Sequence, residues 1–500
     1  MKNYLFYGLT AISLIATGCT TEDDDNSSPG IMEGFFSYVY TNNGIVEAPQ
    51  SGDKFDEYKD NPFVKTADEP VSTFSVDADG ASYAIMRNTV NRGYNVTPAS
   101  VRIEEFLNYF TFNYAAPAGD DNVAINAEVG DCPWTPGHYL LRLGIKGKEL
   151  TAAETPRANF VFLVDVSGSM SSSDKLDLLK KGLTELLYQL NPDDRISLIT
   201  YSGEVKKLLE STPVSEANKI KKAIGKLTAS GCTAGGEALK MAYEEALANY
   251  DAACNNRVIM GTDGDFNVGI TSTDALVEMV ESYARRGIYM TCLGFGMGNL
   301  NDAMMEKISN SGNGTYNYID CEDEMMKVFV HERSRFVSVA NDVKCQLTFN
   351  PQVVSEYRLI GYENRVMSSE DFENDKKDAG EIGAGQTITA LYEIVLSDAA
   401  AANAQETLAT FDLRYKKSLD AASIPLQLKV RADAPLLEHM RSADFYFAAG
   451  VAAYGMLLRE SPHKGQATIS MAKSLVERGL SFDPHGYRAE LLKLMNKKVE

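Results

Sequence analysis

The sequence is poor in cysteine, tryptophan, histidine and basic residues. Its 500 residues include seven Cys, one Trp and five His, and 48 Lys and Arg stand against 69 Asp and Glu, for a formal net charge of −21. This charge repels polyphosphate, which excludes nucleic-acid binding through a general basic surface, and it suits metal cations or basic partners. Seven cysteines are too few for a fold held together by disulfides. The hydrophobic content of 44% nevertheless predicts a globular protein.

Long apolar runs and common catalytic motifs are also missing. No stretch reaches the roughly 18–20 apolar residues of a membrane-spanning helix, and the nearest one, Phe445–Leu458, predicts a buried helix. The chain contains no His-Glu-x-x-His, Gly-x-Ser-x-Gly or Gly-x₄-Gly-Lys motif. We therefore expect that the protein is not an enzyme.

The N-terminus is typical of an exported protein. Met1 and Lys2 precede an apolar run of 13 residues, Tyr4–Ala16, which is too short to span a bilayer but suits a signal-peptide core. The run leads into Ala16-Thr17-Gly18-Cys19, which resembles a bacterial lipobox. The resemblance implies cleavage before Cys19 and acylation of that residue, so that a lipid anchors the protein to a membrane. The alternative is an ordinary secretory signal peptide followed by a cysteine by chance.

The segment after the signal peptide predicts a flexible tether and indicates where in the cell the protein is located. Residues 1–18 are the predicted signal peptide and residues 19–66 a lipidated flexible tether, with one short docking segment around Asn61-Pro62-Phe63. Glu22–Asp25 resembles the acidic signal with which some bacteria export lipoproteins to the cell surface, although a solvated tether explains it equally well. We expect a cell-envelope location at the outer membrane, with the periplasmic or surface face left open.

The rest of the chain changes texture twice. Residues 67–150 predict an N-terminal domain, and residues 157–338 alternate strand and helix patterns, as in a doubly wound α/β domain with a parallel sheet. The apolar run Phe160–Val164 predicts a strand buried on both faces. Residues 341–500 predict a β-rich region, interpreted as a sandwich, followed by helices.

Oxygen-bearing residues follow the predicted strands of the α/β domain. Asp165, Ser167 and Ser169 come directly after the first strand, Thr233 lies in a later glycine-rich loop, and Asp263 follows the strand that ends near Met260. Open α/β sheets bind ligands at the carboxyl ends of their strands, so these side chains are expected to converge. Carboxylate and hydroxyl oxygens suit Mg²⁺, Mn²⁺ or Ca²⁺ rather than zinc.

The order Asp-x-Ser-x-Ser, then Thr, then Asp closely resembles the metal-ion-dependent adhesion site of von Willebrand factor type A (VWA) domains. The flanks resemble a bacterial exported or lipoprotein subfamily of that family, in which a VWA domain lies between an N-terminal associated domain and a C-terminal accessory domain. The segments that carry this second resemblance are Phe74–Tyr83, Arg102–Phe106, Cys132–Trp134 and Thr262–Asn267.

The resemblance implies a metal site and a mode of binding. Ser167, Ser169 and Thr233 are its implied direct ligands, Asp165 and Asp263 bind directly or through water, and Mg²⁺ is the first choice of cation. An open coordination position then captures an acidic group of a protein partner, whose identity is unknown. Two other functions stay open: an assembly factor of an envelope complex with a non-essential metal site, and a metallohydrolase.

Other patterns receive simpler interpretations. Two loops that begin at Ser75 and at Asp263 imitate calcium-binding EF-hand loops but depart from the required positions. His331 is interpreted as a packed or surface residue, and Trp134 as a packing anchor. An oxidising envelope allows disulfides, whose pattern the sequence leaves open, among Cys132, Cys232, Cys254, Cys292, Cys321 and Cys345.

Overall fold

The computed structural model describes residues 52–231, 236–264, 273–397, 407–431 and 441–497. The predicted signal peptide and Cys19 lie outside these ranges. No helix within them is long and apolar enough to cross a lipid bilayer.

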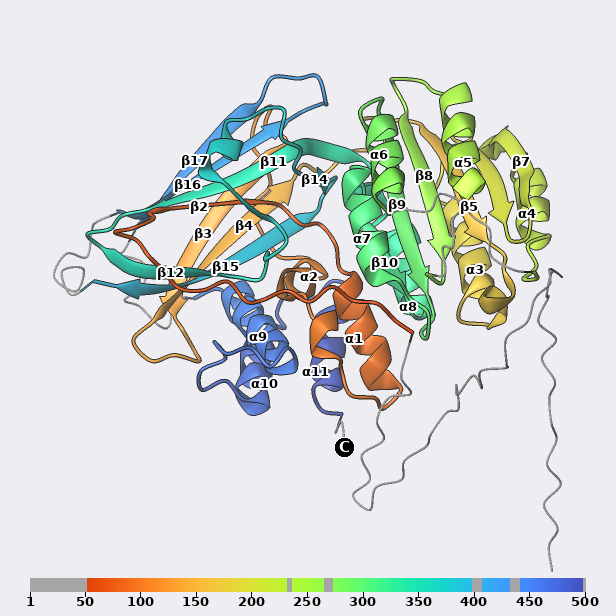
Figure 1. The fold of residues 1–500 in the computed structure, drawn as a ribbon. Coiled ribbons are helices and arrows are strands. Elements are labelled where there is room, and N and C mark those ends of the chain that lie inside the picture. The colour runs from red at the N-terminus through yellow and green to blue at the C-terminus, as the bar shows by residue number, and fades with distance from the viewer. Residues whose placement is uncertain (1–51, 232–235, 265–272, 398–406, 432–440, 498–500) are drawn as a thin grey trace, which may run out of the picture. The chain divides into compact units, whose positions relative to one another are not determined.

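The predicted α/β domain contains a six-stranded sheet in the order β10-β9-β8-β5-β6-β7 (Figure 1). Every neighbouring pair is parallel except β6 and β7. Its strands are β5 (Ala158–Asp165), β6 (Arg195–Tyr201), β7 (Val205–Pro213), β8 (Asn255–Thr262), β9 (Ile288–Phe295) and β10 (Tyr316–Ile319). Its helices are α3 (Leu176–Leu187), α4 (Ala217–Gly225), α5 (Gly236–Ala248), α6 (Thr273–Ala284), α7 (Asp302–Ser311) and α8 (Glu322–Met326).

Helices cover both faces of this sheet because its central strand is apolar on both sides. Phe160, Phe162 and Val164 of β5 pack into a core with α3 and α4. Val161 and Leu163, which point to the opposite face, pack into a second core with α5, α6 and α7. The alternation follows from the two-residue period of a strand, and it confirms the predicted fully buried strand.

Two elements of this domain differ from the sequence prediction. Strand β7 was not predicted, because Val205–Pro213 is polar on its exposed face and lies at the sheet edge, antiparallel to β6. The sheet is therefore mixed rather than wholly parallel. The helical pattern at the end of the domain does not continue as one α-helix: α8 leads into a wider π-helical turn at Lys327–His331, where the buried Lys327 ammonium lies 3.4 Å from Glu332.

The flanking segments form two antiparallel sheets, with strand orders β1-β12-β15-β4-β3 and β13-β2-β11-β16-β17, and β14 pairs with β11. Each sheet contains strands from before and from after the α/β domain, and one apolar core contains residues of both sheets. The strands are β1 (Val64–Lys65), β2 (Val71–Ser75), β3 (Val123–Asp131), β4 (Tyr139–Gly147), β11 (Ser338–Phe349), β12 (Val354–Ile360), β13 (Val366–Met367), β14 (Gly380–Gly383), β15 (Thr387–Leu396), β16 (Thr407–Lys416) and β17 (Ile424–Arg431). Segments 67–150 and 341–500, which were predicted as separate domains, thus share both sheets.

Five helices from the same two segments pack together beside these sheets (Figure 1). Helix α9 is apolar on all sides, as predicted for a buried helix, and its N-cap Ser442 accepts a hydrogen bond from the Phe445 N–H at 3.0 Å. The helices are α1 (Ala81–Asn91), α2 (Ile103–Asn108), α9 (Ala443–Leu458), α10 (Ile469–Arg478) and α11 (Tyr487–Leu494).

The last part of the predicted tether is bound to the fold. The Asn61 side-chain amide donates to the carbonyls of Leu359 and Gly361 at 3.3 and 2.8 Å, and β1 adds to the edge of β12. Phe63 meets the His138 ring edge-on, with 5.6 Å between ring centroids. The expected docking segment at Asn61–Phe63 is present, and the predicted flexible tether of residues 19–66 extends too far toward the C-terminus.

The cysteines do not pair within the described residues, where Cys132, Cys254, Cys292, Cys321 and Cys345 are all free. Cys232 lies outside these residues. Cys132 and Cys345 are buried in two different apolar cores.

The predicted packing residues lie as expected. Trp134 is fully buried and donates its indole N–H to Glu393 at 3.1 Å. His331 stacks on His485, with 4.4 Å between ring centroids, and its Nδ1 lies 3.0 Å from the Tyr487 hydroxyl.

Candidate metal centre

The carboxyl ends of β5, β6 and β8 bring the predicted ligands to one edge of the α/β sheet. Asp165 is the last residue of β5 and pairs in register with Tyr201, the last residue of β6. Val164 pairs with Gly261 of β8, which ends one residue before Asp263. Because all three strands are parallel, Asp165 and Asp263 leave the sheet on the same side.

Hydrogen bonds hold the loop after β5 in place. The Asp165 carboxylate accepts the Ser167 N–H at 2.8 Å through Oδ1 and the Thr262 hydroxyl at 3.1 Å through Oδ2. The hydroxyl oxygens of Ser167 and Ser169 lie 2.9 Å apart. The structure therefore places one carboxylate and two hydroxyls in a single short loop.

The loop that carries Thr233 begins beside this one. The Ser230 N–H donates to the Val166 carbonyl at 2.7 Å, and the Gly168 N–H donates to the Gly231 carbonyl at 3.0 Å. Gly231 has a φ of +80°, a backbone conformation that favours glycine. Thr233 itself lies outside the described residues, so its role as a ligand stays a prediction.

Asp263 has one oxygen that is paired and one that is not. Its Oδ2 accepts the Lys175 ammonium at 2.9 Å, whereas its buried Oδ1 has no hydrogen-bond partner. The next residue, Gly264, has a φ of +94°, and a side chain there would collide with the backbone of Asn301. A buried carboxylate oxygen without a partner is costly and fits a cation binding at this point.

The electrostatics of the site agree with a place for positive charge. Burial raises the pKa of the Asp165 carboxyl, the hydrogen bonds from Ser167 oppose that rise, and the nearby Asp263 carboxylate adds to it. A divalent cation between the two carboxylates would relieve both effects. The described donors, all hard oxygens, fit Mg²⁺, Mn²⁺ or Ca²⁺.

The sequence prediction missed Lys175, which precedes α3 and is only 11% exposed at its side chain. A Cβ at position 296 would lie 2.0 Å from Lys175 Cε, so Gly296 makes room for the lysine. No sequence signal pairs Lys175 with an aspartate 88 positions away. The sequence prediction also missed Thr262, although it directly precedes the predicted Asp263.

In the loop at Ser75, which imitates an EF-hand, both oxygens of Asp77 already accept hydrogen bonds from the protein. Asp77 accepts the Asp79 N–H at 2.9 Å and the Arg365 guanidinium at 3.1 Å. Within the described residues, the cluster of carboxylates close enough to share one ion is Asp77, Glu105 and Glu306, and Arg102 and Arg365 form ion pairs with it. The second imitation, which begins at Asp263, lies mostly outside the described residues.

Comparisons with known proteins identify the family. Three family models match in series: "von Willebrand factor" over residues 49–142, "von Willebrand factor type A domain" over residues 159–330, and "Uncharacterized protein YfbK, C-terminal" over residues 334–500. The chain is 37% identical to the Escherichia coli K12 protein YfbK over 467 residues, which cover 88% of this chain and 80% of YfbK. The chain belongs to the YfbK family.

Other relatives share less of the chain. The Synechocystis protein sll0103 is 28% identical over 189 residues, which cover 38% of this chain and 44% of that protein. A solved von Willebrand factor type A protein from Catenulispora acidiphila is 16% identical, with 78% of this chain and 91% of that chain covered and a TM-score of 0.45.

These findings bear out the predicted fold at the level of the YfbK family. The chain contains a VWA α/β domain, antiparallel sheets and C-terminal helices. VWA domains mediate protein binding and often hold a divalent cation at an adhesion-type site. Membership of the family does not identify the cation, its ligands or the partner of this chain.

Proposed function

We propose that this protein is a binding module of the cell envelope, whose VWA domain holds Mg²⁺ and captures an acidic group of a protein partner. The observation that carries the proposal is the edge where Asp165, Ser167, Ser169 and Asp263 meet, with the Asp263 Oδ1 buried and unpaired. Thr233 is the proposed fifth ligand. When bound, the cation supplies a coordination position that a partner's carboxylate can fill.

Binding fits the surroundings of the site better than catalysis does. His138 contacts Glu393, His331 and His485 stack on one another, and His463 contacts Phe63, so these four described histidines are engaged away from the proposed ligands. His439 lies outside the described residues. With Lys175 as the charged neighbour of Asp263, the described part of the site offers no evident general base.

One observation favours the second candidate, an assembly factor with a non-essential metal site. The Lys175 ammonium already neutralises one oxygen of Asp263 at 2.9 Å, so the carboxylate keeps a charge partner without any metal. In that case the flanking sheets and helices, rather than the cation, would hold the partner.

Capture of partners with and without EDTA separates the two candidates. Affinity capture on the purified protein, from native envelope extracts, is expected to retain a specific partner in Mg²⁺ and to lose it in EDTA. Adding Mg²⁺ back is the control, and it should restore capture. A partner that stays bound in EDTA would favour the assembly factor and contradict capture through the metal.

Replacing Lys175 by methionine is expected to tighten Mg²⁺ binding by roughly three- to tenfold. The lysine ammonium and a divalent cation compete for the same carboxylate, and methionine keeps the length of the side chain without its charge. Isothermal titration with MgCl₂ measures the change. Lys181→Met is the matched control. It removes the same charge from helix α3, where Lys181 makes an exposed ion pair with Glu322 of α8, and it should leave the affinity unchanged. Weaker binding by Lys175→Met would show that the lysine positions Asp263 for the metal.

We propose that Cys19 is the site of lipidation and that the protein is anchored in the outer membrane. The proposal rests on the resemblance of Ala16–Cys19 to a lipobox. Cys19→Ala is expected to move the protein from the membrane fraction into a soluble or uncleaved form, which fractionation and mass spectrometry of the N-terminal peptide detect. Unchanged fractionation without an acyl mass in the wild type would contradict the anchor.

A further inference from the structure

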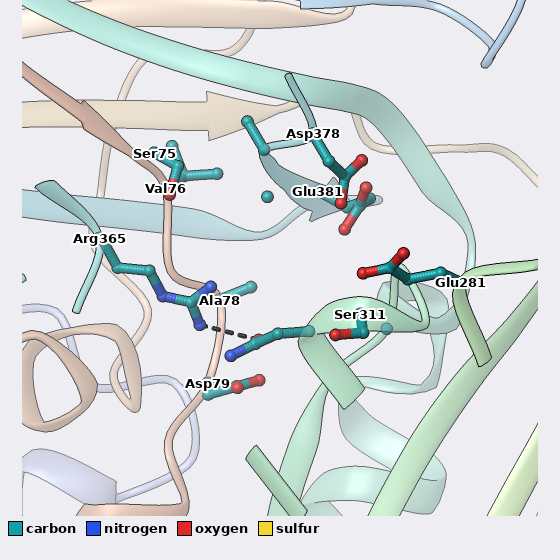
Figure 2. Close-up of a pocket in the computed structure, with 13 residues that line it drawn as sticks. Ser75, Val76, Ala78, Asp79, Glu281, Ser311, Arg365, Asp378 and Glu381 are labelled. Atoms are coloured by element: carbon teal, nitrogen blue, oxygen red, sulfur yellow. Dashed lines mark hydrogen bonds between the residues drawn. The ribbon is translucent and has the colours of Figure 1, made fainter. Parts of the chain in front are cut away.

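A pocket separate from the candidate metal centre lies where the VWA domain meets the flanking sheets (Figure 2). It has a volume of about 170 Å³ and is lined by α6 and α7 on one side and by β2 and β14 on the other. Water occupies about 30 Å³ per molecule in the liquid, so the space is that of roughly six water molecules. It is large enough for an organic head group.

Carboxylates dominate its lining. Glu281 comes from α6, Asp378 precedes β14, Glu381 lies within β14, and Asp79 follows β2. Figure 2 shows the carboxylates of Glu281, Asp378 and Glu381 pointing toward the same space. The pocket therefore gathers carboxyl groups from both domains, and burial raises the pKa of Asp79 and Glu381 well above the usual range, an effect that a bound cation would oppose.

An unpaired buried oxygen of Asp79 is independent evidence that this pocket binds a hydrogen-bond donor. The residue is 2% exposed, and its Oδ1 accepts the Tyr316 N–H at 2.8 Å. Its Oδ2 is buried and has no hydrogen-bond partner, and the buried Oε1 of Glu381 has none either. Two such oxygens in one polar pocket are expensive unless a donor fills it.

The basic groups around the pocket donate to other partners, although the buried Nε of Arg257 has none. Arg365 donates to Asp77 at 3.1 Å and to the Asn310 side chain at 2.8 Å. Lys344 and Lys416 both pair with Asp342, at 3.2 and 2.8 Å. Arg257 donates to the Thr291 hydroxyl at 2.8 Å and to the Phe336 carbonyl at 2.9 Å. None of these groups donates a hydrogen bond to the Asp79 Oδ2 or the Glu381 Oε1.

The spacing of the acids argues against a bare metal ion. Within the described residues, Asp77, Glu105 and Glu306 bring three carboxylate oxygens within 4.8 Å of one another, and the acids of this pocket do not. A guanidinium or ammonium group offers several N–H donors spread over a few ångströms, which suits carboxylates that are further apart.

We propose that this acidic pocket binds an organic cation, namely a guanidinium or primary ammonium group on a flexible chain, with Asp79 and Glu381 as its acceptors. The group has two chemical sources: a free small amine, or a basic side chain of a polypeptide. Either source would insert the cation between the VWA domain and the flanking sheets. The site is distinct from the proposed metal centre, so the proposal does not depend on Mg²⁺.

Titration of the whole mature protein with agmatine, which carries both cationic groups, tests the proposal. We expect calorimetry to show saturable binding in the millimolar range or tighter, weakening as NaCl is raised. A blocked peptide with one internal arginine is the second arm: binding of both probes indicates a polypeptide source, and binding of agmatine alone indicates a small amine. No binding of either probe would overturn the proposal.

Matched variants locate the site. Asp79→Asn keeps an acceptor for the Tyr316 N–H and is expected to weaken agmatine binding by roughly tenfold or more, as is Glu381→Gln. Glu370→Gln, which removes an exposed charge from the same flanking region, should leave binding unchanged. Thermal melting confirms that each variant is folded. Equal affinity in wild type and both pocket variants would overturn the assignment.

Discussion

Replacing Arg87 by methionine is expected to lower the free energy of unfolding by about 3–5 kcal/mol. Arg87 lies on α1 and is buried, and its guanidinium donates to Asp320 at 3.0 Å, to Glu324 at 2.7 Å and to the Tyr109 hydroxyl at 2.6 Å. It also reaches Glu490 of α11 at 3.3 Å. Methionine would leave buried carboxylates without a counter-charge, which is the costly way to break a buried ion pair.

The arginine matters because its partners come from three parts of the chain. Asp320 and Glu324 belong to the VWA domain, Tyr109 and Arg87 itself to the N-terminal segment, and Glu490 to the C-terminal helices. The loss is therefore expected to loosen the packing between segments as well as the helix itself.

Urea unfolding of wild type and variants measures this effect. Arg92→Met is the matched control, because Arg92 lies one residue beyond the end of α1 and makes an ion pair with Asp174 at 2.8 Å in which both side chains are partly exposed. It should cost less than about 1 kcal/mol. Equal effects of the two substitutions would contradict a structural role for the buried network.

Much of the α/β domain could be predicted from the sequence because its patterns are local. The strand predicted at Phe160–Val164 lies within β5, and outside this domain the buried helix predicted at Phe445–Leu458 lies within α9. Strand β7 could not be recognised, because the edge of a sheet tolerates lysines and leaves no regular alternation.

Local sequence patterns could not predict how the strands of the flanking segments pair. Strand β2 pairs with β11, whose partner residues stand about 270 positions later, as in Thr73 and Gln346. Alternation along the chain indicates a strand, but it does not name the partner strand. The shared sheets therefore became visible only in three dimensions.

The candidate metal centre could be predicted from the sequence only in part. Asp165, Ser167, Ser169 and Asp263 were predicted because each follows a strand whose end the sequence marks. Lys175 could not be predicted, since its contact with Asp263 depends on the space left by Gly296 rather than on a motif.

Asp165→Ala is expected to abolish most of the thermal stabilisation that Mg²⁺ gives to the wild-type protein. A cation that binds only the folded state stabilises it by about 2.7 kcal/mol at a hundredfold excess over Kd, which raises Tm by several degrees. The substitution removes a carboxylate and leaves the Ser167 and Ser169 hydroxyls, which are too weak to hold a divalent ion alone. Ser167→Ala and Thr233→Val each remove one neutral oxygen and should weaken the response less.

Thermal melting with and without MgCl₂ measures these responses, and Asp177→Ala is the matched control because it removes an exposed carboxylate from helix α3. Cys232→Ser, which leaves the neighbouring Thr233 hydroxyl in place, should respond to Mg²⁺ as the wild type does. Burial raises the pKa of the Asp165 carboxyl, which means that the charged form is costly to keep in the folded protein. Without metal, removing this carboxylate should therefore offset part of the free energy lost with its hydrogen bonds. We expect Asp165→Ala to stay folded. An equal response to Mg²⁺ in wild type and Asp165→Ala would show that the ion binds elsewhere, and capture of a partner through this site would then be excluded.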